Sequence, residues 1–205
     1  MRICLVSSPT VTEFDSRVAD TGAVRLISEQ APIGILTLAA ILRQHGITVE
    51  VVDLNRTYYR YLRSAAYRRR ADFCSFVARD FASRSFDVWG FSTICSTYPL
   101  TIRIARELKR SHPQSVVMLG GPQASVVDAA TLWAFPFIDF IVRGEADETL
   151  PLLLAALPDM RRFGEIPGVT FRSGGSIVRN PNAPVVLDLD KLPMPAFDQI
   201  GRAHV

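Results

Sequence analysis

Short apolar runs recur along the chain, and most are followed by a segment whose apolar residues have helical spacing. Five runs are rich in β-branched residues and almost unbroken, as expected of strands that are buried on both faces of a parallel sheet. They are residues 2–7 (RICLVS), 48–54 (TVEVVDL), 86–92 (FDVWGFS), 115–120 (SVVMLG) and 139–144 (DFIVRG). The pattern therefore predicts five buried strands.

Helical patterns lie between and after these runs. The predicted helices cover residues 32–46, 98–113, 124–135 and 145–157. The first has Pro32 near its start and Gly46 just past its end, the usual punctuation of a helix. Its apolar residues Ile35, Leu38, Ala39 and Leu42, and those of the second, Ile102, Ala105 and Leu108, should face the sheet. The last carries acidic residues in its expected first turn, where the helix dipole favours them.

Regular alternation of strand and helix predicts a doubly wound α/β domain, Rossmann- or flavodoxin-like, over residues 1–158, with right-handed crossovers. The pattern then changes. GVTFR (168–172) and SIVRN (176–180) flank a Gly-rich turn and predict a β-hairpin, and VVLDLDKLPMPAFD (185–198) has the composition of a linker. Residues 159–198 are thus interpreted as hairpin and linker. The final IGRAHV equals one reading frame of a common sequencing adapter, so we interpret residues 199–205 as a non-native tail rather than a natural C-terminus.

Composition narrows the class of protein. Of 205 residues, 48% are hydrophobic and 21% charged, which is typical of a soluble globular domain, and the net charge of +3 is too small to indicate nucleic acid. No apolar run is long enough to span a membrane, and the N-terminal run is too short for a signal peptide. Three widely spaced cysteines predict neither a disulfide framework nor a metal site. We expect a cytoplasmic protein without nucleic-acid or membrane partners.

One basic stretch could contradict that expectation. Residues 56–70 (RTYYRYLRSAAYRRR) interleave arginine with tyrosine, a combination that binds nucleic acid in some proteins. No second basic cluster extends the patch. We favour the simpler interpretation, a solvated helix at the edge of the domain.

Ligands of open α/β sheets bind at the carboxyl ends of the strands, so the residues there are the candidates for function. The familiar ligand-binding signatures are missing. The first strand is followed by SSPTVT and not by GxGxxG or a pair of acidic residues. No GxxxxGK[ST] motif and no histidine cluster occurs in the sequence. His45 and His112 stand beside helix ends and are interpreted as capping or surface residues. Cys95 lies near the predicted edge and is interpreted as a buried, inert thiol.

What remains at the strand ends is small, polar and uncharged. Gly120 and Gly121 would let a ligand approach the backbone, and a helix after Pro122 would point free N–H groups at it. Ser92 and Thr93 would add hydroxyl donors. This suits a large cofactor that is neutral or carries a phosphate. Taken alone, the GGP sequence is equally consistent with a tight turn that binds nothing.

Six motifs in this order resemble one family: PIGILTLAAILRQHG, DLN, GFSTICSTYP, LGGPQAS, DFIVRGEADETLPLLL and IPGVTFR. The chain, from residue 1 to about 198, resembles the N-terminal cobalamin-binding domain of cobalamin-dependent radical S-adenosylmethionine enzymes. In that family a radical S-adenosylmethionine barrel with a CxxxCxxC motif for a 4Fe–4S cluster follows the linker. This chain has no CxxxCxxC, so we expect a fragment that binds cobalamin and does not catalyse by itself.

The resemblance also implies which residues bind the cofactor. The nucleotide tail would meet Gly120, Gly121, Pro122, Gln123 and Ala124, and its path would be lined by Ser92, Thr93, Gly144, Glu145 and Ala146. The corrin face would lie near Ser7, Ser8, Pro9, Leu54 and Asn55. No catalytic or metal-ligating residue is assigned. The sequence lacks DxHxxG, whose histidine ligates cobalt in methionine synthase, so we expect cobalamin to bind with its own base displaced and without a protein histidine.

Methyl transfer is the reaction that the resemblance favours, although rearrangements and cyclisations also occur in the family. Two other hypotheses stay open at the level of sequence. One is a stand-alone flavodoxin-like module that binds a flavin or a nucleotide, for which SSPT would have to serve as the phosphate loop. The other is an interaction domain without a ligand, in which GGP is only a turn.

Overall fold

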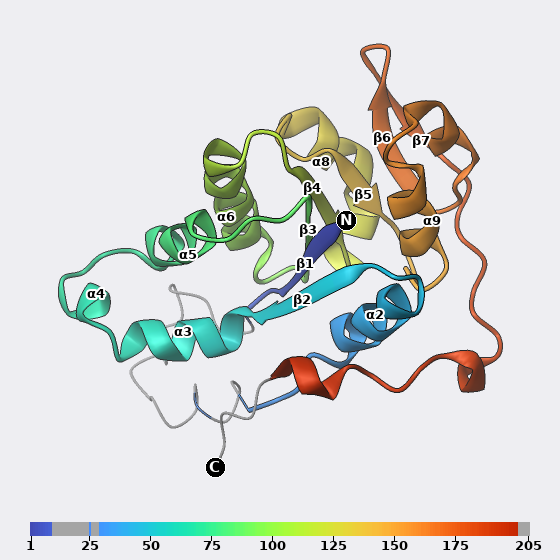
Figure 1. The fold of residues 1–205 in the computed structure, drawn as a ribbon. Coiled ribbons are helices and arrows are strands. Elements are labelled where there is room, and N and C mark those ends of the chain that lie inside the picture. The colour runs from blue at the N-terminus through green and yellow to red at the C-terminus, as the bar shows by residue number, and fades with distance from the viewer. Residues whose placement is uncertain (10–24, 26–28, 201–205) are drawn as a thin grey trace.

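The computed structural model of the chain describes residues 1–9, 25 and 29–200, and these form one mixed seven-stranded sheet with helices on both faces (Figure 1). The strand order is β2-β1-β3-β4-β5-β6-β7. The strands are β1 (Arg2–Ser7), β2 (Thr48–Asp53), β3 (Val88–Ser92), β4 (Val116–Gly120), β5 (Phe140–Val142), β6 (Val169–Ser173) and β7 (Ser176–Arg179). The first five pair in parallel, which confirms the doubly wound α/β fold.

The strand count is the one correction to the predicted sheet. The hairpin was expected to stand apart from a five-stranded sheet, but β6 pairs antiparallel with β5 and β7 extends the sheet further. Because β5 would otherwise be an edge strand with a free row of N–H and C=O groups, pairing with the hairpin satisfies them. The local sequence predicted the hairpin itself but not the strand that it joins.

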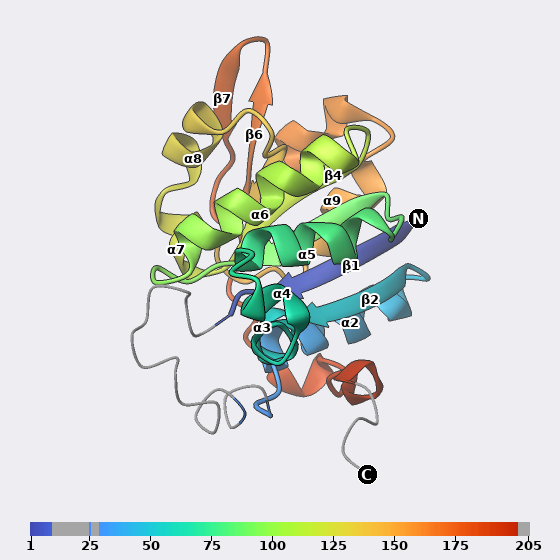
Figure 2. The ribbon, with the colours of Figure 1, turned by 90° about the vertical axis from the view of Figure 1, so that its left-hand side faces the viewer.

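Helices α2 (Ile33–Gln44) and α9 (Thr149–Ala156) cover one face of the sheet. Helices α3 (Leu54–Leu62), α5 (Phe73–Ala82), α6 (Tyr98–Ser111) and α8 (Asp128–Ala134) cover the other. Figure 2 shows α5 and α6 lying across the strands on their side. The side chains of β1 alternate between the two cores: Leu5 belongs to the α2 core, and Cys4 and Val6 to the α6 core.

The helix-facing residues are placed as predicted. Ile35, Ala39 and Leu42 are buried in the first core, with Leu38 partly buried beside them. Ile102, Ala105 and Leu108 are buried in the second. The 3.6-residue period of apolar positions therefore determined which face of α2 and α6 meets the sheet.

Two predicted helices have different bounds. The segment 124–135 is divided at Val127 into α7 (Pro122–Val126) and α8, and α9 begins only at Thr149. The acidic residues of 145–148 therefore precede α9, and its first turn contains none. They lie directly before the N-terminus of α9, with Glu148 at the N-cap, and not within its first turn as expected.

The basic, tyrosine-rich segment is also more than a solvated helix. It forms α3 and the short α4 (Ala65–Arg68), and Tyr58 and Tyr61 are buried. Their rings lie 4.9 and 5.4 Å from the ring of Phe73, so the tyrosines anchor α3 on α5 while the arginines face outward. The part of the chain that the structure describes also contains the 3₁₀ turns η2 (Met160–Glu165), η3 (Leu189–Lys191) and η4 (Phe197–Ile200). Among the described residues, no helix has the length and apolar character needed to cross a membrane.

Candidate functional site

The carboxyl ends of β1, β3, β4 and β5 meet at one edge of the sheet. The chain order reverses between β1 and β3, because β2 lies on one side of β1 and β3 on the other. Such a switch point opens a crevice above the sheet and is the usual ligand site of this architecture. Ser92 pairs in register with Gly120, so two of the predicted site residues stand side by side there.

The turn after β4 explains why two glycines end that strand. Gly121 has φ +88° and ψ 176°, a region open in practice only to glycine. A Cβ atom on Gly121 would lie 2.7 Å from the carbonyl oxygen of Thr93 and 2.8 Å from its nitrogen. The structure thus gives a different reason for Gly121 from that inferred from sequence: the absent side chain makes room for the loop after β3.

Thr93 holds this turn in place. Its fully buried hydroxyl donates to the carbonyl oxygen of Gly120 at 2.8 Å and accepts from the backbone N–H of Ala124 at 3.0 Å. The N–H of Gln123 donates to the Thr93 carbonyl oxygen at 3.3 Å. The expectations that Thr93 offers a free hydroxyl and that α7 offers free N–H groups at these positions are therefore not met, because these groups bond to one another.

A cavity of about 360 Å³ opens beside this turn, between α2 and α9 and above the sheet. It lies on the face of the sheet that carries the α2 core. Five of the residues proposed from sequence line it: Ser92, Gly120, Gly121, Gly144 and Ala146. The size falls within the range of small-molecule sites. The tertiary structure thus brings strand ends and two helices together around one mostly apolar space.

The sequence reasoning missed the rest of the lining. These residues come from β1, α2, the interior of β3 and β4, the end of β5 with the turn after it, α9 and the linker: Leu5, Gly34, Ile35, Thr37, Leu38, Gly90, Phe91, Met118, Leu119, Val142, Asp147, Leu150 and Leu192. Gly90 had a readable signal, since a glycine inside a buried strand often marks a close approach. A Cβ there would lie 3.1 Å from Leu5 Cδ2 and 3.5 Å from Met118 Cγ, so it would point toward the cavity side of the sheet.

The turn after β5 forms one wall of the cavity. Gly144 has φ +68°, and its N–H donates to the hydroxyl of Ser125 at 3.0 Å. The carboxylate of Glu145 accepts from the N–H of Val186 at 3.1 Å. Asp147 lines the cavity, where burial raises the pKa of its carboxyl above the usual value. This wall is therefore fixed to α7 on one side and to the linker on the other.

The remaining predicted residues lie at the same edge but outside this cavity. The Ser7 hydroxyl donates to Asp53 Oδ1 at 2.8 Å, and the Ser8 hydroxyl bonds to the Thr101 hydroxyl at 2.9 Å and to the Ser92 carbonyl oxygen. Pro9 is buried, and Leu54 is fully buried in the core on the opposite face of the sheet. The Asn55 N–H donates to Oδ1 of Asp53, the N-cap residue of α3, at 2.9 Å. The first-strand loop and the DLN segment thus lie at the same edge of the sheet but do not line the cavity.

Comparison with known proteins identifies the family. The family model described as "B12 binding domain" matches residues 23–154, more than half of the chain. The chain belongs to the B12-binding domain family. Cobalamin is the cofactor for which this family is named.

Several curated proteins match this chain in sequence, and two of them illustrate the range. The uncharacterized methyltransferase PH0819 of Pyrococcus horikoshii is 25% identical over 200 residues, which is 97% of this chain and 38% of that protein. The anaerobic magnesium-protoporphyrin IX monomethyl ester cyclase of Synechocystis sp. is 33% identical over 101 residues, which is 49% of this chain and 20% of the cyclase. The B12-binding chain therefore spans well under half the length of these relatives.

A solved structure has the same fold. The radical S-adenosylmethionine methyltransferase TsrM from Kitasatospora setae, with cobalamin and a [4Fe–4S] cluster bound, superposes with a TM-score of 0.62. The match covers 94% of this chain and 31% of TsrM at 22% identity. At this identity the likeness supports the fold of the B12-binding domain and not a residue-by-residue equivalence.

The residues of the cavity fit the cofactor that the family name implies. Cobalamin carries a nucleotide tail that ends in a flat aromatic base, and the cavity offers apolar walls and a floor at Gly90 without a side chain. The glycines at 34, 120, 121 and 144 also line the cavity and place no side chain in it. A flat apolar group can enter such a space without displacing a core side chain.

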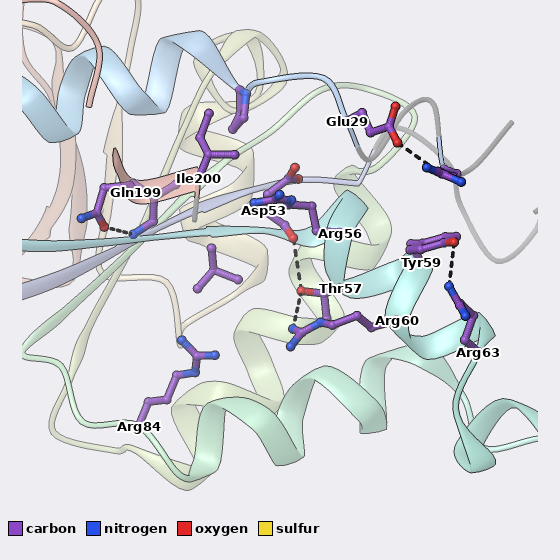
Figure 3. A pocket seen from close by; sticks show the side chains of 14 residues that line it. Glu29, Asp53, Arg56, Thr57, Tyr59, Arg60, Arg63, Arg84, Gln199 and Ile200 are labelled. Atoms are coloured by element: carbon purple, nitrogen blue, oxygen red, sulfur yellow. Dashed lines mark hydrogen bonds and ion pairs between the residues drawn. The ribbon is translucent and has the colours of Figure 1, made fainter. Parts of the chain in front are cut away.

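A larger hollow of about 590 Å³ lies elsewhere in this B12-binding domain, beside α3 and the end of β2 (Figure 3). Its arginines already have protein partners: Arg63 donates to the Tyr59 hydroxyl at 3.0 Å, and Arg60 to the Thr57 hydroxyl at 3.2 Å. Arg84 pairs with Asp80 at 2.9 Å. It includes none of the residues at the ends of β3, β4 and β5, so we assign the candidate site to the smaller cavity.

The histidines and cysteines of the described residues do not build a metal centre. His45 and His112 are the C-cap residues of α2 and α6, as predicted, which places them at the opposite edge of the sheet from the cavity. His204 lies outside the described residues. Within residues 1–9, 25 and 29–200, no group of three or more His, Cys, Asp or Glu side chains could hold a metal ion. Cys95, expected to be buried, is exposed, because it sits in the loop between β3 and α6.

Proposed function

We propose that this chain binds cobalamin as the cofactor module of a radical S-adenosylmethionine enzyme, and that the enzyme transfers a methyl group. The observation that carries the proposal is the cavity between α2 and α9 at the switch point of the sheet. Its lining comes from seven separate parts of the chain, and its floor is a glycine in the middle of a buried strand. We infer that the base at the end of the cobalamin tail occupies this cavity.

The residues proposed for the tail are those that line the cavity: Ser92, Gly120, Gly121, Gly144 and Ala146. Thr93 and Ala124 are buried behind them and hold the turn in its shape. Ser7, Ser8, Pro9 and Asn55 lie at the same edge of the sheet outside the cavity, where the corrin is proposed to rest. This division assigns contact to the glycines and positioning to Thr93.

The reaction is proposed from the names of the proteins that this chain resembles. PH0819 is named a methyltransferase and TsrM a radical S-adenosylmethionine methyltransferase, whereas the Synechocystis relative is named a cyclase. When bound, cobalamin supplies a cobalt centre that can carry a methyl group. S-adenosylmethionine and a 4Fe–4S cluster are proposed to belong to a further radical S-adenosylmethionine domain, the proposed partner of this module.

The position of the histidines supports a cobalt without a protein ligand. His45 and His112 lie at helix C-termini, at the far edge of the sheet. With the cobalamin base in the cavity between α2 and α9, that base is also removed from cobalt. We therefore propose base-off binding without a histidine from the described residues.

A visible absorption titration of the 205-residue chain with hydroxocobalamin tests the function. We expect saturable binding and a base-off spectrum. The Gly34→Trp variant fills the cavity, since a side chain at Gly34 meets nothing within 4 Å and the residue lines the space. The matched control is Ile33→Trp, which adds the same ring one residue earlier, at an exposed position outside the cavity lining.

Cobinamide, which lacks the nucleotide tail, separates the two parts of the proposal. Gly34→Trp should abolish tight cobalamin binding, while cobinamide should bind the variant and the wild type equally. Failure of the wild-type chain to bind cobalamin would overturn the function. Equal binding of cobalamin by the two tryptophan variants would instead overturn the placement of the tail.

A further inference from the structure

The segment after β7, residues 180–200, is not a free linker. It runs from the hairpin along one side of the molecule and ends beneath α2, as the orange-to-red trace of Figure 1 shows. We call it the strap. Hydrogen bonds fix it at both ends, and each end is attached to an element that also lines the cofactor cavity.

The first anchor is Arg143, the residue before the Gly144 turn. Only 4% of its side chain is exposed, and its guanidinium lies 3.2 Å from the Asp128 carboxylate. It donates to Asn182 Oδ1 at 2.5 Å and to the carbonyl oxygen of Asn180. A buried charge needs such partners, so the start of the strap is fixed by the electrostatics of the β5 end.

The backbone strengthens this anchor. Gly168 N–H donates to the Pro181 carbonyl oxygen at 2.7 Å, and Arg143 N–H donates to the Gly168 carbonyl oxygen at 2.7 Å. Five residues after Pro181, Val186 N–H donates to the Glu145 carboxylate. These hydrogen bonds therefore join the strap to the wall of the cavity formed by 144–146.

The second anchor attaches the strap to α2 and β2. Ala196 is buried, and its N–H donates to the Leu36 carbonyl oxygen at 3.0 Å. Arg43 of α2 makes two hydrogen bonds of 2.9 Å to the Asp198 carboxylate. Gln199, the first residue of the segment interpreted from sequence as a non-native tail, accepts from the Val51 N–H at 3.2 Å, so the anchor rests chiefly on Ala196 and Asp198.

Between the anchors, one apolar side chain of the strap reaches the cavity. Leu192 lines it, together with residues of α2 and α9. The other large apolar side chains of this stretch are exposed, Leu187 at 95% and Met194 at 80%. The two anchors therefore hold the strap so that Leu192 forms part of the cavity wall. Leu192 is distant in sequence from every other lining residue.

We propose that Leu192 is an affinity-determining residue for the nucleotide tail of cobalamin, and that the strap closes the cavity over that tail. The proposal rests on the proposed function. Leu192 contributes apolar area that the tail buries on binding, and the anchors pre-organise it so that little ordering is needed when the cofactor enters. Cobinamide lacks the tail and should not depend on Leu192.

The test compares Leu192→Ala with Leu187→Ala in the full 205-residue chain. Both remove the same atoms from the same strap, but only Leu192 lines the cavity. We expect Leu192→Ala to weaken hydroxocobalamin binding roughly tenfold, as the loss of a partly buried leucine contact implies, and Leu187→Ala to leave it unchanged. Binding is measured by visible absorption, with cobinamide as the second probe and thermal unfolding of the ligand-free proteins as the check on folding.

The outcomes are distinct. Equal affinities of the two variants for cobalamin would overturn the role of Leu192, and so would a tenfold loss for cobinamide as well. If the wild type binds neither corrinoid, the proposed function fails instead. A tail-specific loss in Leu192→Ala alone supports both.

Limited proteolysis gives a readout independent of affinity. Lys191, with 81% of its side chain exposed, directly precedes Leu192, and Arg161, with 90% exposed, serves as a reference site outside the strap. Saturating cobalamin should slow tryptic cleavage after Lys191 and leave cleavage after Arg161 unchanged. Cobinamide should protect neither site. Unchanged cleavage after Lys191 in the presence of bound cobalamin would overturn closure by the strap.

Discussion

The hydroxyl of Thr93 donates to the carbonyl oxygen of Gly120 at 2.8 Å, and this bond joins the loop after β3 to the turn after β4. The same hydroxyl accepts from Ala124 N–H, so a single buried side chain satisfies both partners. The shape of the cavity between α2 and α9 depends on this turn, because Gly120 and Gly121 line it.

Replacing Thr93 by valine tests this bond. Thr93→Val keeps the shape of the side chain but leaves the buried N–H of Ala124 without an acceptor, while Gly120 still accepts from the Thr93 N–H at 2.9 Å. We expect the free energy of unfolding to fall by about 1–3 kcal/mol, measured by urea denaturation. Thr93→Ser retains the hydroxyl and is the control. A Thr93→Val variant as stable as Thr93→Ser would show that the bond contributes little.

The two glycines of the turn should tolerate substitution differently. Gly121→Ala forces a Cβ against the Thr93 backbone and requires alanine at φ +88°, so we expect a loss of at least about 2 kcal/mol in the free energy of unfolding. Gly120→Ala is the matched control, because its Cβ would meet only the Val142 carbonyl oxygen, at 3.5 Å. Chemical denaturation of the two variants measures the difference. Equal losses would contradict the explanation given for Gly121.

Asp53, at the end of β2, should make folding pH-dependent. Burial raises the pKa of its carboxyl above 3.8, although hydrogen bonds from Asn55 and Ser7 oppose the shift. Its Oδ2 atom is buried and has no hydrogen-bond partner within the described part of the chain. Because the folded state holds this proton more tightly than the unfolded state, wild-type stability should fall as the pH rises from 3.8 through the raised pKa.

The Asp53→Asn variant removes this titration and keeps a capping oxygen for Asn55. Its stability relative to wild type should rise with pH over that window and level off above it, as measured by urea denaturation at a series of pH values. Asp72→Asn is the control of opposite sign, because hydrogen bonds from Ser75 lower the pKa of Asp72. There the wild type gains stability as the pH rises toward 3.8, so the stability of Asp72→Asn relative to the wild type should fall over the same range. A flat difference for Asp53→Asn would contradict the prediction.

The buried ion pair that anchors the strap should be costly to break. Asp128 accepts from Thr170 and Arg179 at 2.7 Å and pairs with Arg143; burial raises its pKa, but these hydrogen bonds outweigh burial and hold the pKa below the usual value. Asp128→Asn leaves the Arg143 charge uncompensated, so we expect a loss of about 3 kcal/mol.

The control for this variant is Asp159→Asn, at the exposed pair with Arg161, which should cause no measurable change. Denaturation of both variants by urea gives the comparison. The Asp128 contribution depends on an ionised carboxylate, so in the wild type it should be lost as the pH falls through the lowered pKa. If Asp128→Asn unfolded at the same urea concentration as the wild type, the anchor would not depend on charge.

Local patterns along the chain were enough to predict the order and type of most elements. The β-branched runs gave five parallel strands, and the helical period gave the buried faces of α2 and α6, because both patterns are local consequences of backbone geometry. It also located the turn at 120–122, where the backbone needs glycine. The six family motifs indicated cobalamin from the sequence, without any knowledge of the contacts between elements.

The contacts between these strands, helices and turns followed only from the packing of the whole chain. Thr93 was expected to face a ligand and instead holds the turn, and the hairpin joins β5 instead of standing apart. The cavity combines Leu5, Gly34, Gly90, Leu150 and Leu192, which no spacing in the chain relates. Local patterns fix which face of an element is apolar, but the partner of that face is chosen by the packing of the whole sheet. For that reason local motifs indicated the family, whereas the wall of the proposed cofactor site followed only from the fold.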